Sequence, residues 1–153
     1  MNDATLKQLR LEWKSGDATK VGRAILNQIP LADQVLRAVA ILDVCRTRCS
    51  SVPAVDAVSE LARAPQRWHE AHEHFSAIRK LTLLEESHST NPTYYVLLFV
   101  AENTAKTIYN ATEPIDAFDE DAPFWLAKNA REMARRVNDP AFEDRLWQAL
   151  IGA

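Results

Sequence analysis

Three of the chain's four histidines lie in the stretch WHEAHEHF, from Trp68 to Phe75, and glutamates stand between them. Histidines and carboxylates at short spacing are the usual ligands of zinc and other divalent metals, so this stretch is the first candidate for chemistry. On a regular helix, with about 100° per residue, His69 and His72 lie one turn apart, whereas His74 points away from both. The candidate metal ligands are therefore His69, His72 and Glu73.

The spacing of this stretch departs from the stronger metal motifs. A zincin needs two histidines four residues apart, and HEAH places them three apart. A four-ligand zinc site would combine Cys45 and Cys49 with His69 and His74, although a whole expected helix separates the two pairs. The simplest interpretation is the charged flank of an ordinary helix, with zinc or another divalent cation as the alternative.

The two cysteines, Cys45 and Cys49, are four residues apart and are expected on one face near the end of a helix. A nucleophilic cysteine needs a base and a lowered pKa. Arg46 and Arg48 would lower the pKa, but no histidine is near in the sequence. We interpret both as small buried hydrophobic residues. So few cysteines fit a reducing compartment better than a disulfide framework, which predicts a cytoplasmic protein.

The acidic segment from Glu113 to Asp121 carries five carboxylates. It lacks the alternating ligands and central glycine of an EF-hand, so calcium fits it poorly. Aromatic anchors inside a charged rim are typical of a protein-binding edge. The candidate partner-binding residues are Phe118, Asp119, Asp121, Phe124 and Trp125. In the competing interpretation the aromatic side chains pack into the core, and Asp119 to Asp121 cap the next helix and complement its dipole.

A stripe of cations follows on the same expected helix, with Lys128, Arg131 and Arg135 at one-turn spacing and Arg136 beside them. Such a stripe usually faces solvent, and Glu132 can pair with Arg136 across one turn. The net charge of −3 and the pI near 5.8 give no general attraction for nucleic acid or for an anionic membrane. Three scattered glycines cannot form a phosphate-binding loop.

The elements that carry these residues are expected to be helices of one domain, residues 1–153. With 47% apolar and 25% charged residues, a chain of this length buries a core without metals or disulfides. The N-terminus lacks the pattern of a secretory signal. The longest mostly apolar run, Tyr94 to Ala101, is much shorter than the roughly 20 residues of a bilayer span, so a soluble protein is expected.

Cap and turn signals divide the chain into about eight helices, with no confident strand. Asp17, Asn91 and Asp139 are the expected N-caps, and one helix is expected from 65 to about 86. The run YYVLLFV alone favours a strand as much as a helix, but it continues unbroken into AENTAKTIYNA. One central buried helix near residues 92–109 follows. The predicted architecture is an all-α single-domain bundle or short helical array.

No motif identifies a family or a catalytic residue. The leading hypothesis is a small helical protein that binds another protein as an adaptor, inhibitor or immunity-type module, so a binding protein is favoured over an enzyme. The alternative is a metal-binding protein or metalloenzyme that uses the histidines at 69–74. A helical enzyme without metal would need a cleft with shifted pKa values. A homodimer could also cover the aromatic edge.

Overall fold

The computed structural model describes residues 1–88, 91–112 and 120–153, and at 86–88 it describes the main chain only. All the regular secondary structure in these ranges is helical. The all-α prediction is confirmed. Within these ranges no helix is both long and apolar enough to cross a membrane. The helices are α1 (Asp3–Ser15), α2 (Ala18–Leu26), α3 (Leu31–Arg46), α4 (Pro53–Ala62), η1 (Pro65–Glu70), α5 (Ala71–His88), α6 (Pro92–Thr112), α7 (Ala122–Val137) and α8 (Pro140–Ile151).

The helix starts follow the capping residues. The side chain of Asp17 accepts hydrogen bonds from the first turn of α2, and Asp139 accepts one from the first turn of α8. Asn91 accepts a hydrogen bond from the amide of Tyr94 at 3.2 Å, and Pro92 opens α6. These contacts satisfy main-chain N–H groups that have no partner inside a helix, which is why the predicted boundaries are correct here.

The junction before α5 differs from the prediction of one helix from 65 to about 86. Residues Pro65–Glu70 form the 3-10 helix η1, and the α-helix starts at Ala71. The chain turns sharply after α4, and the indole Nε1 of Trp68 donates a hydrogen bond to the carbonyl of Leu61 at 3.0 Å. The Leu61 carbonyl also accepts from the amide of Ala64 at 3.0 Å, so the indole is its second donor and links η1 to the last turn of α4.

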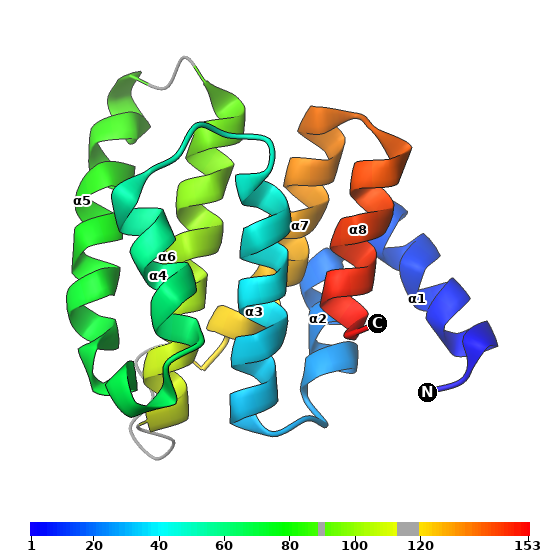
Figure 1. Cartoon of the computed structure of the whole chain (residues 1–153). Helices are drawn as coiled ribbons and strands as arrows, with labels where there is room; N and C mark the ends of the chain where they lie inside the picture. Colours follow the sequence, from blue (N-terminus) through cyan, green and yellow to red (C-terminus); the bar gives the residue numbers. More distant parts are fainter. Residues whose placement is uncertain (89–90, 113–119) are drawn as a thin grey trace.

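The centre of the bundle is α6, which packs against α3, α4, α5 and α7. Figure 1 shows α1 at one edge of the molecule and α5 at the opposite edge, with α3 and α6 between them. Val96, Leu97, Leu98, Val100 and Ala101 are buried, which confirms the predicted central helix. It continues to Thr112, slightly beyond the predicted end at 109.

The second half of α6 buries polar side chains as well. Thr104 and Thr107 donate hydrogen bonds to the carbonyls one turn earlier, each at 2.7 Å. The amide nitrogen of Asn103 donates to the carbonyl of Phe99 at 3.1 Å. Because a buried polar group without a partner costs free energy, these bonds let polar residues occupy a central helix.

Candidate functional site

The histidine stretch lies on the surface. His69 is in η1, whereas His72 and Glu73 are in the first turn of α5, and all three are exposed. The ring of His72 lies near the rings of Phe75 and Tyr109, with centroids 6.2 and 6.3 Å away. In the part of the chain that the structure describes, no three His, Cys, Asp or Glu side chains form a group that could hold a metal ion. The two-histidine site stays a prediction.

The cysteines do not share a helix face as predicted. The helix α3 ends at Arg46, where the hydroxyl of Thr47 donates to the carbonyl of Val44 at 2.6 Å, so Cys49 lies in the following turn. Cys45 is completely buried. Burial raises the pKa of both thiols, so neither has the thiolate character that a nucleophile needs.

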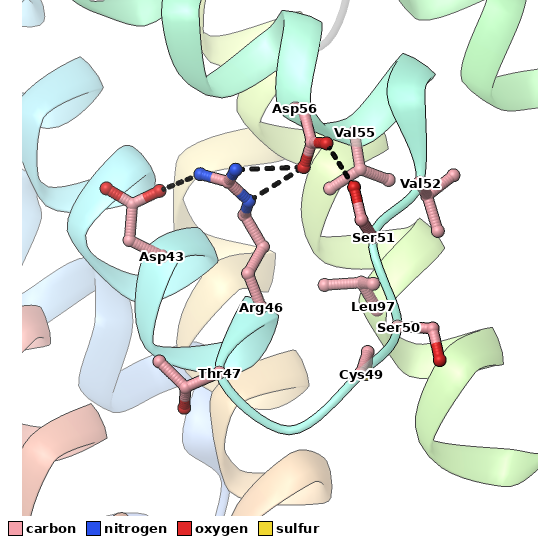
Figure 2. A pocket seen from close by; sticks show the side chains of 10 residues that line it. All are labelled: Asp43, Arg46, Thr47, Cys49, Ser50, Ser51, Val52, Val55, Asp56 and Leu97. Carbon is pink, nitrogen blue, oxygen red and sulfur yellow. Dashed lines mark hydrogen bonds and ion pairs between the residues drawn. The ribbon is translucent and has the colours of Figure 1, made fainter.

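A hollow of about 330 Å³ lies beside this turn, between the end of α3 and the start of α4. Figure 2 shows the Arg46 guanidinium between two carboxylates: it donates to Asp43 at 2.9 Å and to Asp56 at 2.8 and 3.1 Å. The hydroxyl of Ser51 donates to the other oxygen of Asp56 at 2.6 Å. The hollow is lined by Asp43, Arg46, Thr47, Cys49, Ser50, Ser51, Val52, Val55, Asp56 and Leu97.

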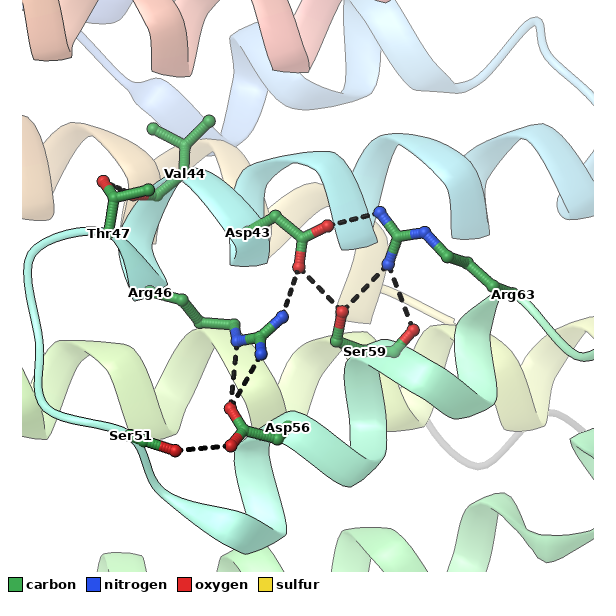
Figure 3. Close-up of polar contacts among 8 residues, drawn as sticks. All are labelled: Asp43, Val44, Arg46, Thr47, Ser51, Asp56, Ser59 and Arg63. Carbon is green, nitrogen blue, oxygen red and sulfur yellow. Dashed lines mark hydrogen bonds and ion pairs between the residues drawn. The ribbon is translucent and has the colours of Figure 1, made fainter.

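These ion pairs continue into a network that joins α3 to α4 (Figure 3). Asp43 accepts hydrogen bonds from Ser59, at 2.7 Å, and from Arg63. Burial alone would raise the pKa of Asp43, but the hydrogen bonds from Ser59, Arg63 and Arg46 outweigh it and lower the pKa. The hydrogen bond from Ser51 is the main cause of the lowered pKa of Asp56.

The network therefore holds both carboxylates ionised, and the protein's own arginines, Arg46 and Arg63, supply the opposite charges. A carboxylate with a lowered pKa is a weak base, so Asp56 is poorly suited to activate the Ser51 hydroxyl. Among the residues that the structure describes, no histidine lines this hollow. The arrangement is that of a structural clamp between two helices.

The predicted partner-binding edge divides into covered and exposed parts. Asp121 forms an ion pair with Arg23 of α2 at 2.7 Å, and the same guanidinium lies 5.1 Å from the ring centroid of Phe124. Phe124 is half-buried, whereas Trp125 remains 40% exposed. Asp121 is the N-cap residue of α7, but its side chain makes no capping hydrogen bond. Phe118 and Asp119 lie outside the described residues.

Trp125 stands at one wall of a second hollow, of about 340 Å³, which we call the α6–α7 groove. Each helix contributes side chains at one-turn spacing, so two stripes face the same space. The residues are Phe99, Glu102, Asn103 and Lys106 of α6 and Trp125, Lys128 and Asn129 of α7.

Lys128 lies at this groove, and its contacts differ from those of the other cations in the predicted stripe. Arg131 pairs with Glu143 at 2.7 Å, and Arg136 pairs with Glu132 at 2.8 Å, as the helix spacing predicted. The Lys128 ammonium lies 4.7 Å from the ring centroid of Trp125 and, over the described residues, has no carboxylate partner. Within the same ranges the half-buried amide of Asn129 makes no hydrogen bond.

Sequence reasoning named Trp125 as a binding residue, interpreted Lys128 as part of a solvent-facing stripe, and missed the α6 side of the groove. The available signal was the polar run from 102 to 104, which follows an apolar half-helix without a break. No protein-family model matches this chain, and comparisons with curated proteins and with solved structures find no significant match. The function must be argued from the groove itself.

Proposed function

We propose that this protein works by binding another protein, as an adaptor, inhibitor or immunity-type module does, and that the partner contacts the α6–α7 groove. One observation carries the proposal: the exposed Trp125 lines a hollow together with Lys128 and Asn129, whose side chains make no hydrogen bond to any residue that the structure describes. Tryptophan is enriched among the residues that dominate binding energy at protein interfaces.

The hollow around Arg46 offers a partner fewer unpaired groups than the α6–α7 groove does. Around Arg46, the charged groups are already paired with one another. At the α6–α7 groove, the Lys128 ammonium and the Asn129 amide are available to a partner. Both thiols are present as free cysteines, which suits the cytoplasmic location that we propose for this activity.

The test is affinity enrichment from the organism that produces the protein, with amine cross-linking and mass spectrometry. Wild-type protein is compared with Trp125→Ala and with Leu36→Ala, which removes a 55% exposed side chain from α3. The expected result is a protein enriched by wild type and by Leu36→Ala, lost with Trp125→Ala, and cross-linked through Lys106 or Lys128.

Two controls make the result decisive. Circular dichroism must show that Trp125→Ala melts like wild type, since the side chain is partly exposed and its loss should cost little stability. Light scattering of the purified protein reports whether a homodimer already covers the groove. Equal enrichment by Trp125→Ala and wild type would remove the groove as the binding site.

A further inference from the structure

Two amide side chains line the α6–α7 groove, Asn103 from α6 and Asn129 from α7. The Asn103 nitrogen donates to the Phe99 carbonyl at 3.1 Å. Because a carbonyl can only accept, this bond fixes which end of the Asn103 amide faces the helix. The Oδ1 oxygen is left with no hydrogen bond to any residue that the structure describes, although the Asn103 residue is only 8% exposed.

The Asn103 oxygen opens to the groove. Among the described residues, no completely buried side-chain oxygen or nitrogen lacks a hydrogen-bond partner. The Asn103 oxygen does lack one, so it must reach solvent, and the hollow that Asn103 lines is the α6–α7 groove. A nearly buried acceptor that opens into a hollow is well placed to receive a hydrogen bond from a ligand.

The α6 wall of the groove presents acceptors at this point. Beside Asn103 lies the Glu102 side chain, which is 6% exposed and pairs with Arg79 at 3.4 Å. A carboxylate has no donor to offer. The ammonium of Lys106 lies 5.3 Å from the ring centroid of Phe75 on α5 and takes no part in this pair of acceptors.

The α7 wall presents donors. The indole N–H of Trp125 and the ammonium of Lys128 can only donate. Neither group makes a hydrogen bond to a described residue, and Lys128 contacts the Trp125 ring at 4.7 Å. The half-buried Asn129 amide, which also has no hydrogen bond to a described residue, adds two further N–H groups.

A trans peptide unit matches acceptors on one wall and donors on the other. Its N–H and C=O groups lie in one plane and point in opposite directions. A unit placed between the helices therefore turns its N–H to α6 and its carbonyl to α7. A hydroxyl group donates and accepts through one oxygen, so it does not need this separation. Phe99 and Trp125 line the same hollow and give an adjacent apolar side chain a surface to pack on.

We propose that the α6–α7 groove binds the main chain of an extended partner segment. One peptide N–H donates to the Asn103 oxygen, and the carbonyl of the same peptide unit accepts from the Asn129 amide. This inference rests on the proposed function and names the group of the partner that the groove binds.

The experiment is a titration of the full chain with defined peptides, followed by NMR through the indole N–H signal of Trp125. The signal is assigned with a Trp125→Phe variant. The parent probe is an acetylated, amidated tripeptide of glycine, phenylalanine and glycine. Three further probes each carry a methyl group on one peptide nitrogen, which removes a donor and leaves the charge unchanged. At least one of them should bind about fivefold more weakly than the parent.

The same titration with Asn103→Ala tests whether this oxygen is the acceptor. The probe that methylation weakens in wild type should bind the variant like the parent probe, because the acceptor of its N–H is gone. A steric effect of the methyl group would persist. Gln8→Ala is the matched control: it removes an exposed side-chain amide from α1, at the edge of the bundle, and should keep the wild-type difference.

A second variant tests the donor wall and does not depend on the folding of Asn103→Ala. The Asn129 amide makes no hydrogen bond to a described residue, so Asn129→Ala should melt like wild type. It should bind the parent probe about fivefold more weakly. Unchanged binding by Asn129→Ala would contradict the assignment of the donor.

The possible outcomes separate this inference from the proposed function. Equal binding of all four probes, a methyl effect that persists in Asn103→Ala, or no movement of the Trp125 signal overturns the main-chain proposal. N-methylacetamide that binds as tightly as the tripeptide also overturns it, because the groove then binds an isolated amide. A Trp125 signal that moves with protein concentration alone identifies a second copy as the occupant, with the same consequence. If a partner is nevertheless lost on enrichment with Trp125→Ala, the binding function stands and only the partner chemistry is wrong.

Discussion

The indole N–H of Trp13 donates a hydrogen bond to the main-chain carbonyl of Ala127 at 2.7 Å, across 114 positions of the sequence. The Trp13 ring is completely buried and lies 5.4 Å, centroid to centroid, from the ring of Trp147. One side chain thereby fixes α1 to both α7 and α8. The Arg10 to Asp144 ion pair, at 2.8 Å, adds a contact at the surface.

Replacing Trp13 should destabilise the protein more than any exposed change on α1. Trp13→Ala leaves a large cavity and should lower the free energy of unfolding by about 3–5 kcal/mol, whereas Trp13→Phe should cost about 1–2 kcal/mol. The control is Leu11→Ala, which removes a 60% exposed side chain from the same helix. Urea unfolding measures all three, and similar midpoints for Trp13→Ala and Leu11→Ala would contradict the anchoring role.

Gly22 marks the closest approach between α2 and α7. A Cβ atom at this position would lie 2.7 Å from the carbonyl oxygen of Phe124 and 2.9 Å from the Cβ of Ala127. Gly22→Ala must therefore push the helices apart and should cost about 1–3 kcal/mol, although alanine favours a helix over glycine. Ala24→Ser, on the exposed face of α2, is the control. A thermal melt in which Gly22→Ala gains stability would show that the crossing has room.

The sequence was sufficient for most helix boundaries because the signals there are local. Asp17, Asn91 and Asp139 cap helices through their own side chains, a few residues from the amides that they serve. Burial of the apolar side chains at 96–98, 100 and 101 was equally readable from the composition of this run. These features depend on neighbours in the chain, which a single sequence displays.

The features that sequence reasoning missed depend on contacts between distant residues. The bond from Trp68 links η1 to Leu61 of α4, and the turn after α3 places Cys49 off the helix. The α6–α7 groove exists only where side chains of two helices face each other, and the polar run from 102 to 104 does not show which helix lies opposite. Pairing of Asp121 with Arg23, 98 positions away, likewise could not be read from the acidic segment.

The thiols should react slowly in the native protein. Burial raises the pKa of Cys45 and of Cys49, so little thiolate is present at neutral pH. With a thiol-specific chromogenic reagent at pH 7, Cys49 should react slowly and Cys45 only when the protein unfolds, with both reacting at once in guanidinium chloride. Cys49→Ser leaves one slow site as the control. Rapid modification of two thiols in the native state would contradict the buried placement.

The exposed histidines should bind a divalent metal weakly at most. His69 and His72 belong to different helices, and no described carboxylate or thiol completes a three-ligand group with them. Zinc titration by calorimetry should therefore give no tight stoichiometric site, and His69→Ala with His72→Ala should melt like wild type. Stoichiometric zinc in the purified protein, lost in the double variant, would instead favour the metal-binding hypothesis.

Acid should weaken the clamp between α3 and α4. The pKa values of Asp43 and Asp56 are lowered below the ordinary value of 3.8, so the folded state binds protons less readily than the unfolded state. Their stabilisation is thus complete above this value and is lost as the pH falls through it toward the folded-state pKa values. Asp43→Asn should reduce stability at pH 7 by about 1–2 kcal/mol, because Arg46 and Arg63 lose a charged acceptor.

The measurement is urea unfolding of wild type and Asp43→Asn between pH 7 and pH 2.5. The difference between the two proteins should be largest at neutral pH and shrink below pH 4, since protonation of Asp43 produces the same loss that the variant carries at every pH. Asp33→Asn, in the exposed first turn of α3, is the control and should follow wild type throughout. A constant difference between wild type and Asp43→Asn across this range would show that the Asp43 charge does not stabilise the clamp.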